Sequence, residues 1–163
     1  LLDLMLADSA LLSRHIEPGA FVVDVGTGAG APGLGIFIFR PDIRGILVEP
    51  MQKRVAFLNT VIGELITMGF EAGRVKVLRE RAEKLFAREG EETVMVSRAT
   101  LSPEIWLREG ARLAPRGMVW VLLSQQERPE LEGWEAVYDE QYRWPLSGAQ
   151  RRAVGYKKLS VNK

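Results

Sequence analysis

Short runs of β-branched and other apolar residues recur along the chain and alternate with longer stretches in which apolar residues follow a helical spacing. The first pattern is typical of buried strands and the second of amphipathic helices. The predicted strands cover residues 21–25, 46–48, 75–78, 94–96 and 118–123. The predicted helices cover residues 1–15, 31–39, 51–68, 82–88 and 103–113. This alternation predicts an α/β fold with a mainly parallel sheet.

The last part of the chain has a different pattern. Two candidate antiparallel strands, near residues 136–144 and 153–159, flank the turn-like sequence Pro-Leu-Ser-Gly at 145–148. Five parallel units closed by a hairpin predict a seven-stranded, mostly parallel sheet with helices on both faces and a C-terminal antiparallel hairpin. The length of 163 residues fits one domain over residues 1–163, into which residues 1–20 lead as an N-terminal helix.

Composition narrows the possible chemistry. The chain has no cysteine and a single histidine, His15, which excludes a disulfide framework and thiol catalysis and leaves too few ligands for a zinc or histidine metal site. We therefore expect no metal. No apolar run is long enough for a membrane span and no signal peptide is evident, so a cytoplasmic protein is expected. Because the chain does not begin with methionine, we expect the natural protein to extend upstream.

A glycine-rich segment, VVDVGTGAGAPG at residues 22–33, is the most informative stretch of the sequence. It leads from a predicted strand into a predicted helix, with Pro32 suited to the first turn of that helix. Glycines allow a sharp turn and let the backbone approach a ligand closely, and helix amides face whatever lies across the turn. We expect a nucleoside ligand there, at the carboxyl ends of the strands.

The same glycines fit two kinds of ligand. Gly28, Gly30 and Gly33 satisfy the G-x-G-x-x-G pattern of dinucleotide sites, which alone is weak evidence. Asp24 stands just before them, where its carboxylate would repel a pyrophosphate and attract a cationic sulfonium. The chain is also short for a dehydrogenase with a separate substrate domain. We favour a methyl donor over a nicotinamide dinucleotide, and a dehydrogenase stays as the alternative.

A second acidic residue, Glu49, follows the second predicted strand. A carboxylate at this place can accept hydrogen bonds from both ribose hydroxyls of an adenosine ligand, in NAD and in S-adenosylmethionine alike. The alternative is that Glu49 caps the helix after Pro50, because acidic residues favour helix N-termini.

Four blocks of sequence together resemble the RsmG/GidB family, which methylates guanine N7 in small-subunit (16S) ribosomal RNA. The blocks are DVGTGAG from Asp24 with Pro32-Gly33, Glu49-Pro50 followed by KRVAFL at 53–58, RAE at 81–83, and SRA at 97–99. The resemblance implies a class I S-adenosylmethionine-dependent methyltransferase fold, with S-adenosylmethionine as cofactor and ribosomal RNA or the small ribosomal subunit as partner.

The resemblance also implies site residues. It places Ala82 and Glu83 beside the adenine, mainly through backbone groups, and has Arg98 face the donor and acceptor region. From its position alone, Arg98 could also form an ordinary surface ion pair. The predicted cofactor-binding residues are Asp24, Gly26, Thr27, Gly28, Ala29, Gly30, Pro32, Glu49, Pro50, Ala82, Glu83 and Arg98.

The chain departs from the family after the fifth predicted strand. Family members carry a Lys-Gly pair there, whereas this chain has Leu123-Ser124-Gln125-Gln126. The departure motivates a second hypothesis, a methyltransferase of the same fold that acts on a small molecule or protein. A non-catalytic module that binds S-adenosylmethionine is a separate alternative.

Methyl transfer to guanine N7 needs no general base, because the N7 lone pair is free at neutral pH. Alignment of donor and acceptor can then supply the catalysis. We accordingly predict no catalytic acid or base, and we interpret His15 as structural.

Basic residues gather near the end of the chain. Arg143, Arg151 and Arg152, together with Arg98, are the predicted substrate-binding residues, since a basic hairpin can dock on RNA phosphates. A solvated charged surface explains the same pattern. The formal net charge is only +1, so any RNA site must be a local patch. Each of the four tryptophans could stack on a base or pack in the core. We expect a monomer.

Overall fold

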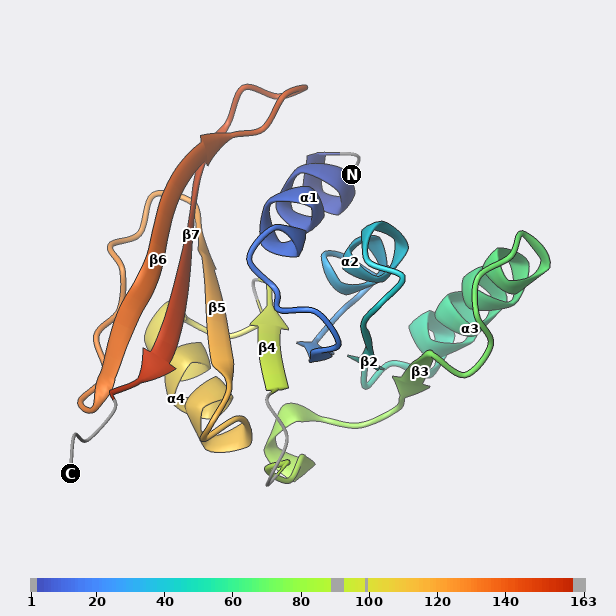
Figure 1. Ribbon diagram of the computed structural model, residues 1–163, viewed down its shortest axis with the longest axis horizontal. Helices are drawn as coiled ribbons and strands as arrows, with labels where there is room; N and C mark the ends of the chain where they lie inside the picture. Colours follow the sequence, from blue (N-terminus) through green and yellow to red (C-terminus); the bar gives the residue numbers. More distant parts are fainter. Residues whose placement is uncertain (1–2, 89–92, 99, 160–163) are drawn as a thin grey trace.

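The computed structural model describes residues 3–88, 93–98 and 100–159 (Figure 1). Residues Leu2, Ala99 and Lys163, which the sequence patterns include, lie outside the described residues. The described residues form one seven-stranded sheet in the order β3-β2-β1-β4-β5-β7-β6. The strands are β1 (Phe21–Val25), β2 (Arg44–Val48), β3 (Val75–Leu78), β4 (Thr93–Ser97), β5 (Met118–Leu123), β6 (Trp134–Arg143) and β7 (Gln150–Lys158).

The first five strands run parallel and the last two close the sheet as an antiparallel hairpin. In register, Val23 of β1 lies between Ile46 of β2 and Met95 of β4. Strand β7 pairs antiparallel with both β5 and β6. This arrangement confirms the predicted mixed sheet with its C-terminal hairpin.

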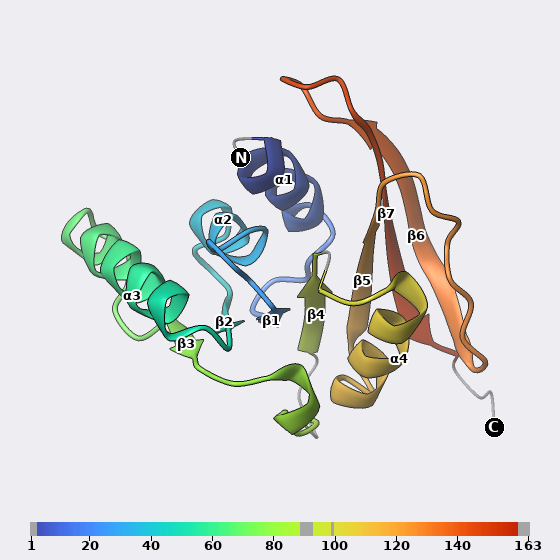
Figure 2. The same ribbon diagram turned by 180° about the vertical axis from the view of Figure 1, so that it is seen from behind.

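Helices cover both faces of the sheet (Figure 1, Figure 2). The helical elements are η1 (Asp3–Ala7), α1 (Asp8–Ser13), α2 (Gly33–Phe39), α3 (Gln52–Thr67), η2 (Ala82–Lys84) and α4 (Pro103–Leu113). Val22 of β1 packs in the cluster that includes residues of α1, α2 and α3, whereas its neighbour Val23 packs in the cluster that includes residues of α4. Successive side chains of a strand point to opposite faces, so one apolar strand supplies both cores.

Three predicted helices differ from the observed elements. The segment 1–15 begins as the π-helix η1, and α2 begins at Gly33 with Pro32 as its N-cap. The helix predicted over 82–88 is only the single 3₁₀ turn η2. There, Leu85 has an extended backbone and packs against the core cluster that includes residues of α4, which we call the α4-side core. The neighbouring Phe86 stays 90% exposed. The apolar residues of this segment have helical spacing, but the backbone at Leu85 is extended and its side chain packs in the tertiary structure.

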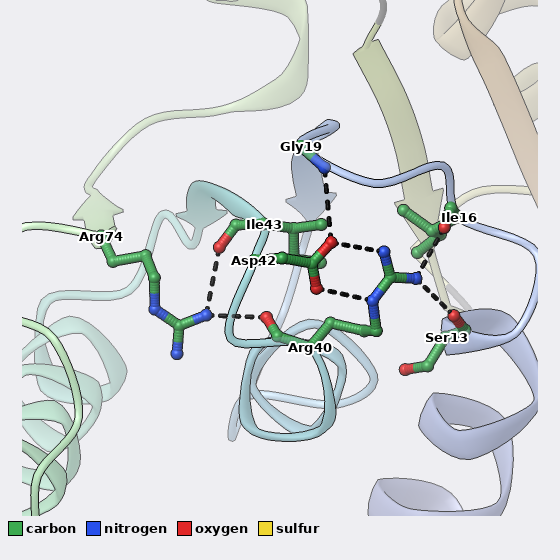
Figure 3. Close-up of polar contacts among 7 residues, drawn as sticks. All are labelled: Ser13, Ile16, Gly19, Arg40, Asp42, Ile43 and Arg74. Atoms are coloured by element: carbon green, nitrogen blue, oxygen red, sulfur yellow. Dashed lines mark hydrogen bonds and ion pairs between the residues drawn. The ribbon is translucent and has the colours of Figure 1, made fainter.

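Two arginines hold the amino-terminal edge of the sheet together (Figure 3). Arg40 pairs with Asp42 through two hydrogen bonds of 2.7 and 2.6 Å and donates to the carbonyl oxygens of Ser13 and Ile16 at 2.8 and 2.6 Å. Arg74 donates to the carbonyl oxygen of Arg40 at 2.8 Å. Carbonyl groups at helix ends lack intrahelical partners, and these guanidinium groups provide them. This edge is structural, and it lies opposite the carboxyl ends of the parallel strands.

Candidate active site

A cavity of about 520 Å³ lies at the carboxyl ends of the parallel strands, beside the switch point where β1 is flanked by β2 and β4. Ligands of open α/β sheets bind at such switch points. We call it the turn cavity. It brings together seven of the predicted cofactor residues, namely Gly26, Thr27, Gly28, Ala29, Glu49, Pro50 and Arg98.

The glycine turn combines one open and one crowded position. Gly28 has a φ of +61°, and a β-carbon added to it would meet nothing within 4 Å. Because Gly28 also lines the turn cavity, its bare backbone faces open space. A β-carbon on Gly33 would instead lie 2.6 Å from the side chain of Asp24 and 2.7 Å from that of Leu47. Gly28 thus suits ligand approach, whereas Gly33 permits close packing under the turn.

Asp24 lies beneath the turn and not in the lining of the cavity. Its carboxylate is fully buried, and Oδ2 accepts hydrogen bonds from the Thr27 hydroxyl at 2.6 Å and the Gly33 amide at 2.8 Å. Burial raises the pKa of Asp24 to about 6, and the nearby charge of Glu49 adds to the shift. The close approach of Gly33 places this carboxylate behind the lining of the turn cavity, and its attraction for a cationic donor stays a prediction. Its observed part is to fix the shape of the turn.

Glu49 joins the glycine turn to the start of α3. Its side chain is 2% exposed, and its two oxygens accept hydrogen bonds from the amides of Gly28 at 3.0 Å and Met51 at 2.9 Å. The guanidinium of Arg54 lies 3.7 Å from Oε2. Glu49 contacts the N-cap residue of α3, as the capping interpretation requires, and it also lines the turn cavity, so binding of ribose hydroxyls stays a prediction.

The remaining predicted cofactor residues lie outside the lining of the turn cavity. Gly30 and Pro32 are buried within the turn, and the Pro32 carbonyl accepts a hydrogen bond from Ser9 at 2.8 Å. Ala82 packs against the α4-side core, whereas Glu83 is exposed. The structure therefore does not bring Ala82 and Glu83 to the glycine turn.

Arg98 connects the turn cavity with a second cavity of about 170 Å³. This second space, the hairpin cavity, lies between the ends of β4 and β5 and the β6–β7 hairpin. Its polar lining includes Arg98, Ser124, Gln126, Tyr142 and Arg151. A residue that lines both cavities is placed where a donor in one could meet an acceptor in the other.

Arg98 pairs with a buried acid that the sequence analysis missed. Asp8 of α1 is fully buried, and Oδ2 accepts a hydrogen bond from Arg98. Its Oδ1 accepts from the hydroxyl of Tyr142 at 2.6 Å and from Nε1 of Trp144 at 2.7 Å. Asp8 stands three and four positions before Leu11 and Leu12, on the apolar side of its helix, which is the sequence signal of a buried acid. The surface ion pair considered for Arg98 is thus a buried one.

The predicted basic hairpin divides between the two faces of the sheet. Arg151 lines the hairpin cavity, and its guanidinium carbon lies 3.9 Å from the centre of the Trp144 ring. Arg152 points to the opposite face, where it forms two hydrogen bonds of 2.6 Å with Asp139. Arg143 is exposed at the end of β6. Of these three, the structure brings only Arg151 to the cavity that Arg98 lines.

His15 and the tryptophans have mainly structural surroundings. Nε2 of His15 lies 3.1 Å from Glu140, and its ring centre lies 4.6 Å from that of Tyr138. Trp106 and Trp120 are buried in the core and Trp134 packs against its margin. Among the described residues, no group of three or more acidic or histidine side chains is arranged to hold a metal, and no helix is long and apolar enough to cross a membrane.

Comparison with known proteins identifies the family. The model of the family described as GidB, rRNA small subunit methyltransferase G, matches residues 1–149. The chain belongs to this family. Its members include the ribosomal RNA small subunit methyltransferase G of Mycobacterium leprae, strain TN, which is 46% identical over 99 residues covering 60% of this chain and 38% of the relative. The corresponding protein of Nocardioides sp. is 38% identical over 140 residues, covering 81% of this chain and 54% of the relative.

The chain spans about half the length of the curated relatives it matches. Solved structures share its fold at low identity. The 1,6-didemethyltoxoflavin-N1-methyltransferase of Burkholderia thailandensis has a TM-score of 0.68 at 15% identity, covering 94% of this chain and 77% of that one. TrmK of M. capricolum has a TM-score of 0.68 at 7% identity, covering 96% and 70%. Together with the strand order, this likeness confirms the predicted class I methyltransferase fold.

Proposed function

We propose that this chain is an S-adenosylmethionine-dependent methyltransferase that modifies guanine N7 in small-subunit ribosomal RNA. The observation that carries the proposal is the turn cavity, in which an open glycine backbone and the buried carboxylate of Glu49 lie next to Arg98. Family membership supports the substrate class. We further propose that residues 1–163 act as one domain, as a monomer in the cytoplasm.

The residues around the turn cavity fit an adenosyl cofactor. Gly28 presents backbone without a side chain, and Glu49 presents a carboxylate whose oxygens can each accept a second hydrogen bond from ribose hydroxyls. S-adenosylmethionine supplies the methyl group on its sulfonium when bound. We assign Asp24 to holding the turn through Thr27 and Gly33. Ala82 and Glu83 remain proposed adenine contacts through the family resemblance alone.

The hairpin cavity fits the acceptor side of the reaction. Among the described residues, Arg98 and Arg151 are the charged residues of its lining. Asp8 balances the charge of Arg98 from behind the lining, so the guanidinium of Arg151 carries the attraction for an anion, such as a phosphate of the RNA backbone. Arg143 and Arg152 are then proposed as outer contacts with RNA at most.

Side chains of this chain would orient the reactants and transfer no proton. Guanine N7 already carries a free lone pair, so placing it in line with the methyl group is sufficient. The described cavity linings contain no histidine or carboxylate on the acceptor side. The absence of a catalytic acid or base stays part of the proposal.

One specific observation favours a second candidate, a small-molecule or protein acceptor. At the family's Lys-Gly position, Ser124 donates its amide and its hydroxyl to Gln126 Oε1, both at 2.8 Å. The chain therefore has a closed polar loop where a cation would otherwise meet RNA.

The test combines binding and transfer. Calorimetric titration should show binding of S-adenosylhomocysteine and none of NAD. A donor with a labelled methyl group should then label small-subunit ribosomal RNA that lacks the modification, at guanine N7. Absence of cofactor binding would contradict the methyltransferase proposal and revive the dehydrogenase or an unrelated role. Cofactor binding with label on a small molecule or protein, and none on RNA, would support the second candidate.

A further inference from the structure

The buried carboxylate of Asp8 gathers three side chains from distant parts of the chain. Arg98, Tyr142 and Trp144 lie 90, 134 and 136 residues from it in sequence. Figure 1 and Figure 2 show α1 beside the ribbon of the β6–β7 hairpin, so one acidic residue of α1 connects this hairpin to the end of β4. Of these side chains, Arg98 lines both the turn cavity and the hairpin cavity.

The guanidinium of Arg98 depends on this acid for its place. Its carbon Cζ lies 4.6 Å from the centre of the Trp144 ring, on which Arg151 also stacks at 3.9 Å. Two cations that stack on one indole repel each other, and an anion beside them offsets this repulsion. Asp8 is that anion for Arg98, and its hydrogen bond to Trp144 fixes the ring on which both arginines rest.

We propose that Asp8 is a positioning residue, which sets the guanidinium of Arg98 between the two cavities so that the acceptor meets the methyl donor. The N-terminal helix thereby takes part in building the acceptor site. The inference rests on the proposed function, and Asp8 acts from behind the cavity walls, since it is a lining residue of neither cavity.

The chain provides a matched control in Asp3. This residue of η1 also ties the N-terminal helical segment to the hairpin, because its carboxylate accepts hydrogen bonds from the amides of Leu146 and Ser147, both at 2.9 Å. It has no recorded bond to Arg98 among the described residues. Asp3→Asn therefore loosens the same two segments and leaves the Asp8–Arg98 pair intact.

The experiment is a double-mutant cycle on RNA methylation. It compares the wild-type chain with Asp8→Asn, Asp3→Asn, Arg98→Gln and the double variant Asp8→Asn/Arg98→Gln, at a temperature where thermal unfolding shows all of them folded. Asp8→Asn is expected to lower kcat/KM for RNA at least roughly tenfold, as loss of a buried charged hydrogen bond would. Asp3→Asn should stay close to wild type, and the double variant should equal Arg98→Gln alone, because Asp8 acts through Arg98.

Two outcomes overturn the inference: equal losses in Asp8→Asn and Asp3→Asn, or losses of Asp8→Asn and Arg98→Gln that multiply. If Asp8→Asn does not fold, Asp8→Glu replaces it in the same cycle, because it keeps the charge and displaces the carboxylate by one methylene. The same two criteria then apply.

A second readout separates this inference from the proposed function. The side-chain NMR signals of Arg98 should carry a ring-current shift from Trp144, which Asp8→Asn abolishes and Asp3→Asn preserves. If the wild-type chain methylates no RNA, the proposed function fails while this shift still decides the position of Arg98. An Arg98 shift unchanged in Asp8→Asn would overturn the positioning role.

Discussion

Oδ2 of Asp24 lies 2.8 Å from the amide nitrogen of Gly33, and the intervening residues form the glycine turn. The same oxygen accepts a hydrogen bond from the Thr27 hydroxyl, while Oδ1 is buried and has no hydrogen-bond partner among the described residues. One carboxylate oxygen thus closes the turn from below. The turn therefore depends on the Asp24 carboxylate, whose ionised form is disfavoured by burial.

We expect Asp24 to make the stability of the protein fall as pH rises. Its folded pKa of about 6 exceeds its ordinary value of 3.8, so the folded state binds more protons than the unfolded state between these values. The wild-type free energy of unfolding should therefore decrease relative to Asp24→Asn by about 2 to 3 kcal/mol between pH 4 and pH 7. Urea unfolding across this range measures the difference, and a difference independent of pH would contradict it.

Substitutions at two glycines of the turn should affect different properties, mainly cofactor binding at Gly28 and mainly stability at Gly33. Gly28→Ala adds a methyl group in open space at a positive φ, which costs about 1 kcal/mol of stability but obstructs the cavity, so binding of S-adenosylhomocysteine should weaken at least roughly tenfold. Gly33→Ala should lower the free energy of unfolding by about 1 to 3 kcal/mol, because the methyl group meets Asp24 and Leu47. Thermal unfolding and calorimetric titration of both variants test the contrast, which fails if the larger stability loss occurs at Gly28.

Glu49→Gln should weaken cofactor binding and the turn together. Both carboxylate oxygens accept backbone amides, from Gly28 and Met51, and a glutamine must turn its NH₂ group toward one of them. We expect a stability loss of about 1 to 3 kcal/mol and at least roughly tenfold weaker binding of S-adenosylhomocysteine. Glu64→Gln, exposed on α3, is the control. Equal binding by the two variants would remove Glu49 from the site.

Arg151 and Arg152 are adjacent in sequence and should differ in their effect on RNA. Arg151→Gln removes a cation from the hairpin cavity, so KM for RNA should rise and the slope of log affinity against log salt should become shallower by about one. Arg152→Gln should change the slope less, because its guanidinium is already paired with Asp139. Filter binding over a salt series compares them, and equal slopes in the two variants would argue against the hairpin cavity as an RNA site.

Arg40→Ala should destabilise the fold without altering the site. It removes the donors to the carbonyl groups of Ser13 and Ile16 at the edge far from the turn cavity (Figure 3). We expect a loss of about 2 kcal/mol in the free energy of unfolding, with the affinity of the folded protein for S-adenosylhomocysteine unchanged. Arg44→Ala, exposed on β2, is the control for removal of a nearby charge. A weaker cofactor affinity in Arg40→Ala would show that the two edges are coupled.

Buried parallel strands were the part of the fold most accessible from sequence. The predicted ranges 21–25, 75–78 and 118–123 coincide with β1, β3 and β5, and the range 103–113 coincides with α4. Strands β1 and β5 are buried along almost their whole length, so β5 appears as an uninterrupted apolar run and β1 as an apolar run broken only by Asp24. The segment around Leu85 was misassigned because helical spacing of apolar residues is necessary for an amphipathic helix but does not guarantee one.

The candidate site was predictable only where it is local in sequence. Glycines next to a strand end identify a ligand turn, and Glu49 follows the adjacent strand, so both were found. The direction of the Asp24 carboxylate could not be predicted, since it depends on how closely Gly33 packs. Asp8 was missed because its partners lie at least 90 residues away, and no single-sequence pattern links them.

The Asp8 contacts also order the steps by which the protein can form. The glycine turn, Glu49 and Arg98 all precede β5 in the chain, whereas Tyr142, Trp144 and Arg151 arrive near its end. During synthesis, the carboxylate of Asp8 can therefore meet Arg98 early, but it lacks Tyr142 and Trp144 until the last hairpin is released. Closing so long a loop is slow and entropically costly, so the donor half of the protein can mature before its acceptor half.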